Sequence, residues 1–138
     1  MIRPLNPSDI NTLQTQDAQK FYESHITEES LSGLDGDNFS YIEDGMVKAL
    51  VGMQLQWSGR AIVWALLGDV KNWVSFHREV KNLMENYINK RGIIRLEMTT
   101  EIDFVQSERW AKMLGFKEES ILKNYGPDGK DHKMMVRL

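Results

Sequence analysis

Two carboxylates in the C-terminal half of the chain could handle protons. In the stretch RLEMTTE, Glu97, Thr99 and Glu101 alternate, so a strand through them would place all three on one face. A carboxylate can accept a proton from a reacting group within hydrogen-bonding reach. Glu101 would lie at the strand end, where the sites of open α/β sheets gather. An ordinary solvated face is the alternative, and the sequence leaves both open.

Metal and nucleophile chemistry is not indicated. The histidines His25, His77 and His132 have no short ligand spacing such as H-x-x-x-H, so we expect no metal site. The sequence has no cysteine, which excludes a disulfide framework, a thiolate nucleophile and a Cys-ligated metal. It also has no Gly-x-Ser-x-Gly, Walker A or Rossmann glycine pattern.

The N-terminal half must supply helices and then a strand meander. Polar Asn6 and Asp9 predict a helix start, with Ile10 and Leu13 facing inward. A second helix is expected over residues 17–26 and a loop over residues 32–38. Three strands are predicted over residues 39–43, 46–57 and 61–67. The last is almost wholly apolar, which predicts a central strand with Trp64 in the core.

The C-terminal half alternates helices with strands. An apolar stripe at helical spacing predicts a helix that ends at Gly92; its members are Val80, Leu83, Met84, Tyr87 and Ile88. After it we expect a strand over residues 93–100 and a helix over residues 104–114. A closing hairpin follows, with strands over residues 121–125 and 132–138. This order predicts an α/β (α+β) fold, a mixed, mostly antiparallel sheet flanked by helices, in a single domain of residues 1–138.

Composition limits the kind of partner. The 138 residues are 41% hydrophobic and 27% charged, as in ordinary globular domains. A net charge of −3 argues against broad nucleic-acid binding, which needs a cationic surface. No apolar run approaches the roughly 18 to 20 residues that span a bilayer, so we expect no membrane insertion and a cytoplasmic location.

Two stretches carry a resemblance to the GCN5-related N-acetyltransferases (GNAT). MIRPLNPSDINTL resembles their common start, in which an I-R-x-x-x-x-x-D segment leads into the first helix. ERWAKMLGFKEES is similar to their late helix, which ends in L-G-F before the next strand. A narrower resemblance, to small GNAT-like proteins of short-tailed bacteriophages of the internal virion type, rests on VWALLG, FHREVKNLM and RWAKMLGF…LKNYGPDGKDH.

This resemblance implies a binding loop for acetyl-CoA. In GNAT enzymes the cofactor pyrophosphate meets backbone N–H groups in a Q/R-x-x-G-x-G/A loop at a helix N-terminus. The corresponding cofactor-binding residues here are Leu66, Leu67, Gly68, Lys71, Asn72 and Trp73. The loop has one glycine, and Asp69 would repel phosphate, so weak binding is expected. The alternative is a plain strand-to-helix connection capped by Asn72 or Ser75.

The resemblance also implies catalytic roles. GNAT enzymes often place a tyrosine general acid at the position that is Ala111 here, and alanine has no proton to give. Tyr125 and Tyr87 remain by residue type. The spacing favours Tyr87 as core, whereas Tyr125, at the end of a strand, could belong to either the core or the site. Glu101 is the candidate base for the acceptor amine. The expected catalytic residues are therefore Glu101 and Tyr125, with no metal.

Two functions stay open from the sequence. One is an acyl-CoA-dependent N-acetyltransferase that acts on an amine acceptor. The other is a non-enzymatic bacteriophage protein on the same scaffold, which would act with a phage or host protein in virion assembly or host interaction. The first would act in the cytoplasm, and the second in the host cytoplasm or the virion. Both fit the expected fold, because a fold does not fix a function.

Overall fold

A computed structural model describes residues 1–13, 27–33 and 36–138. The described elements, in chain order, are β1 (Ile2–Pro4), η1 (Pro7–Asn11), α2 (Glu28–Ser32), β2 (Asp37–Glu43), β3 (Met46–Trp57), β4 (Arg60–Leu67), α3 (Trp73–Arg91), β5 (Arg95–Glu101), α4 (Val105–Met113), β6 (Lys117–Leu122) and β7 (His132–Arg137).

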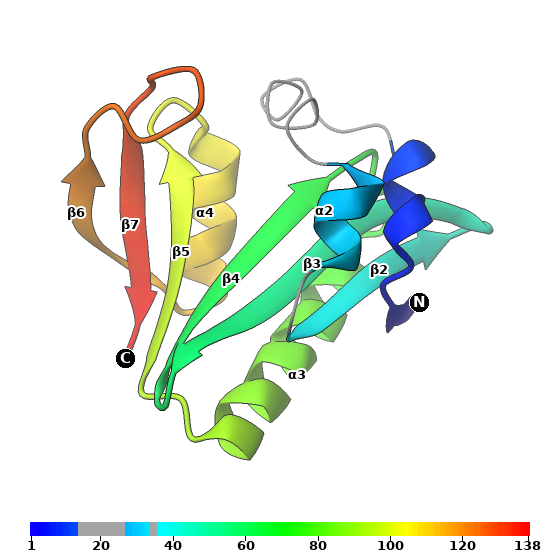
Figure 1. Cartoon of the computed structure of the whole chain (residues 1–138), viewed down its shortest axis with the longest axis horizontal. Helices are drawn as coiled ribbons and strands as arrows, with labels where there is room; N and C mark the ends of the chain where they lie inside the picture. Colours follow the sequence, from blue (N-terminus) through cyan, green and yellow to red (C-terminus); the bar gives the residue numbers. More distant parts are fainter. Residues whose placement is uncertain (14–26, 34–35) are drawn as a thin grey trace. The chain divides into compact units, whose positions relative to one another are not determined.

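The strands form a seven-stranded sheet in the order β1-β2-β3-β4-β5-β7-β6 (Figure 1). β4 pairs with β5 in parallel, whereas β1–β2, β2–β3, β5–β7 and β6–β7 are antiparallel. The predicted mixed, mostly antiparallel sheet flanked by helices is confirmed. The contacts group into two compact units, residues 1–54 with 64–86 and residues 55–63 with 87–138. The single domain stays a prediction.

In the first unit, the N-terminal segment is fixed by a buried carboxylate. Asp9 receives a bidentate pair from the Arg3 guanidinium at 2.8 and 2.9 Å, and Ser40 Oγ donates to it at 2.6 Å. Asn6 caps the turn, as predicted, but η1 is a 3-10 helix of five residues. Charge-assisted bonds of this kind are the strong ones, so they tie β1 and η1 to β2.

Two apolar layers cover opposite faces of β2–β4 in this unit (Figure 1). One layer is a buried cluster from η1 and the residues just after it, α2, β3 and β4, made of Ile10, Leu13, Leu31, Leu50 and Leu66. On the other face, Tyr41 meets Phe76 of α3 edge-on, with ring centroids 4.8 Å apart. Ile10 and Leu13 therefore face inward, as predicted.

The region before β2 differs from expectation. The predicted helix over residues 17–26 lies outside the described residues. Helix α2 was not predicted, and it begins at a capping box in which Thr27 and Ser30 exchange side-chain and backbone hydrogen bonds. Strand β2 starts at Asp37, inside the expected loop, because Asp37 and Asn38 pair with Met53 and Gly52 of β3.

Trp64 is half-buried, so its predicted core position is wrong. It packs against the apolar cluster, and its indole lies directly over Gly52 of β3. A Cβ atom at Gly52 would overlap both the Trp64 ring and Asn38 Oδ1. The missing side chain of Gly52 is therefore what lets the large ring lie against the sheet.

In the second unit, β7 pairs with β5 from Leu96↔Arg137 to Glu101↔His132, that is, along all of β5 except its first residue. Figure 1 shows α4 beside β5. The expected strand over residues 121–125 is displaced, because β6 begins at Lys117, directly after Phe116, and ends at Leu122. Beyond it the chain turns at Asn124, which has a positive φ of 52° and donates its N–H to Asp131.

Within the described ranges, no helix is both long enough and apolar enough to span a membrane.

Candidate functional site

In the first unit, the segment between β4 and α3 forms a capped helix N-terminus. Leu66 and Leu67, both buried, end β4, and α3 begins at Trp73. Asn72 Oδ1 accepts the N–H of Ser75 at 3.1 Å, and the Asn72 carbonyl accepts the N–H of Phe76. Of the two expected caps, Asn72 is the one used.

The backbone N–H groups of this loop converge on a carboxylate. The N–H of Lys71 donates to Glu43 Oε1 at 2.9 Å, and that of Asn72 donates to Glu43 Oε2 at 2.8 Å. The Tyr41 hydroxyl lies 3.2 Å from Oε2. Burial raises the pKa of Glu43, but these hydrogen bonds outweigh it and lower that pKa overall. The loop therefore holds an anion, supplied by the chain itself.

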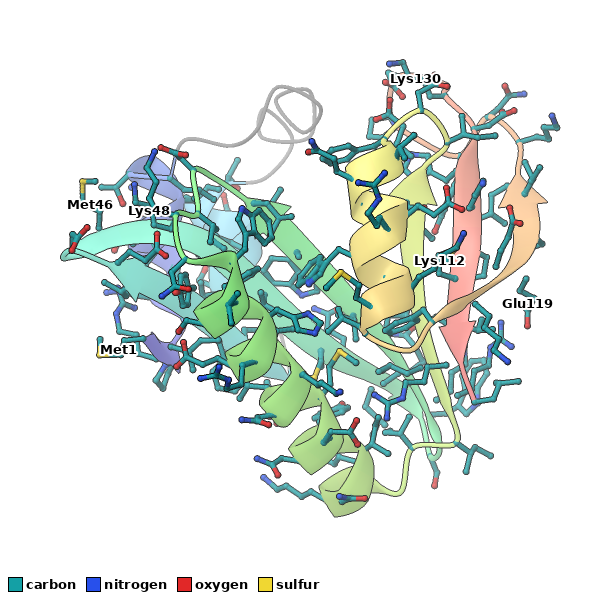
Figure 2. The ribbon with its side chains drawn as sticks, turned by 180° about the vertical axis from the view of Figure 1, so that it is seen from behind. Met1, Met46, Lys48, Lys112, Glu119 and Lys130 are labelled. Carbon is teal, nitrogen blue, oxygen red and sulfur yellow. The ribbon has the colours of Figure 1, made fainter. Side chains whose placement is uncertain are left out.

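The charges around the loop cancel. Lys71 Nζ pairs with Asp69 Oδ2 at 2.8 Å, and both side chains are exposed. Lys48 of β3, labelled in Figure 2, is half-buried, and its carbonyl accepts the N–H of Gly68 at 2.8 Å. The hydrogen bond from Lys71 lowers the pKa of Asp69, and the charge of Lys48 adds to this effect. With Glu43 included, two carboxylates balance two ammonium groups, so the side chains add no net charge and only the backbone N–H groups favour an anion.

Trp73 stands at the first position of α3 and is partly exposed. Its ring meets Phe76 edge-on, with centroids 5.6 Å apart. All six residues expected to contact a cofactor thus lie in one continuous segment of the first unit. Sequence reasoning missed Glu43 and Lys48. Strands β2 and β3 bring them to the loop between β4 and α3, and their spacing along the chain does not indicate that they lie near it.

In the second unit, Glu101 lies at the end of β5 as predicted, but its side chain is buried rather than part of a solvated face. It pairs with Lys130 of the β6–β7 loop, with Nζ 3.0 Å from Oε1. A buried carboxylate is costly without such a cation. Glu101 is therefore a buried carboxylate within hydrogen-bonding distance of a lysine ammonium that is itself half exposed.

Tyr125 and His132 complete this cluster. His132 of β7 is the Cα partner of Glu101, and the Tyr125 ring meets the His132 ring edge-on at 5.3 Å. Tyr125 is half exposed and His132 is buried. Burial lowers the pKa of His132, although Glu101 and Asp128 partly oppose this effect. The structure thus brings the two predicted catalytic residues, Glu101 and Tyr125, to one cluster and adds His132 and Lys130.

Glu97, the other carboxylate of β5, has a structural role. It is almost fully buried between two guanidinium groups, with Arg60 at 2.6 Å and Arg95 at 2.8 Å. The hydrogen bond from Arg60 is the main reason that the pKa of Glu97 is lowered. Ala111, at the position where a tyrosine acid was sought, is fully buried in α4. In the described part of the chain, no group of three or more His, Cys, Asp or Glu could hold a metal ion.

Solved structures share this fold over nearly the whole chain. Ard1 from Thermoplasma volcanium matches with a TM-score of 0.81 at 17% identity, covering 99% of this chain and 95% of the other. The ribosomal-protein-S18-alanine N-acetyltransferase from Escherichia coli matches at 0.74 and 21%, covering 99% and 92%. RimL, a ribosomal L7/L12 alpha-N-protein acetyltransferase in complex with coenzyme A, matches at 0.76 and 15%, covering 99% and 92%.

No protein-family model and no curated protein matches the sequence. At these identities the structural matches define the fold alone. The chain has the GNAT fold.

Proposed function

We propose that this chain is an acyl-CoA-dependent N-acetyltransferase that acts on an amine and binds its cofactor weakly. The fold supports the class of reaction, since its structural neighbours include N-acetyltransferases and one complex with coenzyme A. A protein can keep a fold after it has lost the activity, so the residues of the site must support the proposal as well.

The observation that carries the proposal is the convergence of two loop N–H groups on one carboxylate. Lys71 and Asn72 direct their N–H groups at Glu43, immediately before the first turn of α3. Phosphate needs the same donors, and the positive end of the helix dipole favours it. The loop therefore fits an anionic group, and Lys71, Asn72 and Trp73 would hold the cofactor phosphates. The phosphate would have to displace the Glu43 carboxylate from these two N–H groups, so cofactor binding should be weak.

The cluster of the second unit supplies the groups that amine acetylation needs. Bound acetyl-CoA contributes the thioester whose acyl group is transferred. Glu101 would receive the acceptor ammonium and take up a proton, leaving a neutral amine as the nucleophile. Transfer forms the C–N bond and breaks the C–S bond. Tyr125 would donate the proton that the departing thiolate needs, and it would regain a proton from the acylated nitrogen, which must lose one to become the amide.

A second candidate is a non-enzymatic protein on the same scaffold, acting in virion assembly or in binding a host protein. Two observations favour it: Glu43 already holds the loop N–H groups, and Ala111 cannot act as an acid. The phage-type assignment rests on the sequence resemblance described above.

Calorimetry with coenzyme A, combined with a thiol-release assay over many amines, separates the two candidates. Asp69→Gly removes one repelling charge from the loop and should tighten binding by about three- to tenfold, or roughly 1 kcal/mol. Asp44→Gly is the matched control, because Asp44 is an exposed acid with a positive φ outside the loop. If neither the wild type nor Asp69→Gly binds coenzyme A at millimolar concentration, the enzyme proposal is wrong and the second candidate replaces it.

A further inference from the structure

The backbone of the β6–β7 loop holds Lys130 in a defined position. Its carbonyl accepts the N–H groups of Tyr125 and Gly126, at 3.2 and 3.0 Å. Its own N–H donates to Asp128 Oδ1 at 3.1 Å. Both backbone polar groups are thus bonded within the loop, so the direction of the side chain from this backbone is set locally. Figure 2 shows Lys130 in the loop that joins β6 and β7.

The side chain of Lys130 brings a primary ammonium to a buried carboxylate. Nζ lies 3.0 Å from Glu101 Oε1, and the Glu101 side chain is 9% exposed whereas that of Lys130 is 53% exposed. The Glu101 carboxylate therefore lies in the buried part of the protein, and the Lys130 ammonium approaches it from the solvent side. Such a cation can exchange with another ammonium that pairs with Glu101 in its place, because long lysine side chains are flexible and strongly hydrated.

The surroundings favour any ammonium at this position. The hydrogen bond to Glu101 is the main cause of the raised pKa of Lys130, and the charges of Asp128 and Asp103 add to it. The neighbouring imidazole of His132 has a lowered pKa because of burial, which favours its neutral form. An exposed tyrosine ring, that of Tyr125, flanks His132. Acidic groups and an aromatic ring are the chemistry that recognises alkylammonium ions.

We propose that Lys130 occupies the acceptor subsite of the protein, and that the acceptor is a primary ammonium on a linear alkyl chain. This inference rests on the proposed function, in which Glu101 receives the acceptor amine. Lys130 has the same functional group as such an acceptor and competes with it from within the chain. The side chain must leave Glu101 before an acceptor can enter, so the wild-type protein binds alkylammonium ions poorly.

A second lysine of the same hairpin serves as the matched control. Lys123 Nζ pairs with Asp131 Oδ2 at 3.1 Å, a geometry close to that of Lys130 with Glu101. Its carboxylate partner is three times as exposed, at 27%. Substituting Lys123 therefore removes a hairpin lysine and an ion pair but does not free Glu101.

The test is a titration with n-butylammonium, followed by NMR at the ring signals of Tyr125 and His132, with no acyl-CoA present. Lys130→Ala should bind this ion at least tenfold more tightly than the wild type, because the Lys130 ammonium competes at a local concentration of about millimolar or more; a tenfold effect requires this concentration to exceed the Kd of the empty subsite about ninefold. Lys130→Gln should change in the same direction, and Lys123→Ala should match the wild type. The added substitution Glu101→Gln should abolish the gain.

The proposal is overturned if Lys130→Ala gains less than about threefold, if Lys123→Ala gains equally, or if the gain survives Glu101→Gln. Two further ligands distinguish the source of the amine: a free linear diamine and a lysine blocked at its α-amine and carboxyl groups. Alaninamide, which offers only an α-ammonium, should not bind. This titration needs no cofactor, so it can be separated from coenzyme A binding. If Lys130→Ala binds the alkylammonium ion more tightly but the protein does not bind coenzyme A, the transferase proposal is rejected and the subsite is kept. If the protein binds coenzyme A but Lys130→Ala shows no gain, the subsite alone is rejected.

Discussion

Replacing Glu43 with glutamine should weaken the fold while it strengthens anion binding at the loop. The glutamine oxygen can accept one of the two N–H groups that Glu43 now takes from Lys71 and Asn72, at 2.9 and 2.8 Å. The amide nitrogen cannot accept the other, and the negative charge is lost.

The size of the stability loss follows from these contacts. A hydrogen bond to a charged group contributes about 1.5 to 3 kcal/mol, and partial exposure of Glu43 reduces that figure. We therefore expect Glu43→Gln to lower the free energy of unfolding by about 1 to 2 kcal/mol. For a chain of 138 residues, this corresponds to a fall in Tm of roughly 3 to 7 °C.

The loss should depend on pH in a defined direction. The folded state lowers the pKa of Glu43, so its carboxylate contributes stability above the unfolded value of about 4.3. That contribution is lost as the pH falls through the lower, folded pKa. The difference in unfolding free energy between wild type and Glu43→Gln should accordingly be full at pH 7 and shrink below about pH 4.3.

Thermal unfolding and calorimetry with coenzyme A together test the reasoning. Removing a negative charge a few ångströms from a bound phosphate should tighten binding by about 1 kcal/mol, or roughly fivefold. Asp44→Asn is the control, because it removes the same charge from the next residue, which is exposed. An unchanged Tm in Glu43→Gln would refute the structural role of the carboxylate. Equal tightening in Asp44→Asn would refute competition at the loop.

Three further substitutions test other parts of the account. Gly52→Ala should cost about 1 to 3 kcal/mol in denaturant unfolding, because the new methyl group displaces the Trp64 ring; no loss would show that the ring has room to move. Glu97→Ala should lower the free energy of unfolding, because it removes the buried carboxylate that pairs with both Arg60 and Arg95; an unchanged midpoint of denaturant unfolding would mean that water satisfies the two guanidinium groups. His132→Gln should flatten the loss of stability that the wild type shows as the pH falls below about 6.5, since its lowered pKa makes protonation favour the unfolded state; an unaltered slope would contradict the burial effect.

The fold was predictable because its elements have local signals. The buried strand ending at Leu67 reads as an apolar run, and L-G-F marks the end of α4 at Leu114 and Gly115. Strand β6 was misplaced for a physical reason. From Lys117 to Leu122 it lies at the edge of the sheet and is largely exposed. Its sequence therefore lacks the apolar alternation that predicts a strand, and charged side chains are usual on such edges.

The candidate site was predictable only in part. Glu101 and Tyr125 could be named from strand alternation and residue type, and Asn72 from helix capping. The partners that determine their chemistry could not be named, because they come from distant positions. Glu43 reads as part of a hairpin turn, yet it contacts backbone 28 and 29 residues further on. Lys130 reads as a solvated charge, yet it lies against Glu101, 29 residues away.

Calorimetric titration of the wild-type protein with coenzyme A tests the central claim most directly. The account predicts measurable but weak binding, with a Kd on the order of 0.1 to 1 mM, because the loop offers N–H donors that Glu43 already holds. Absence of any binding heat at millimolar coenzyme A, in a protein whose thermal unfolding is cooperative, would contradict the acetyltransferase proposal.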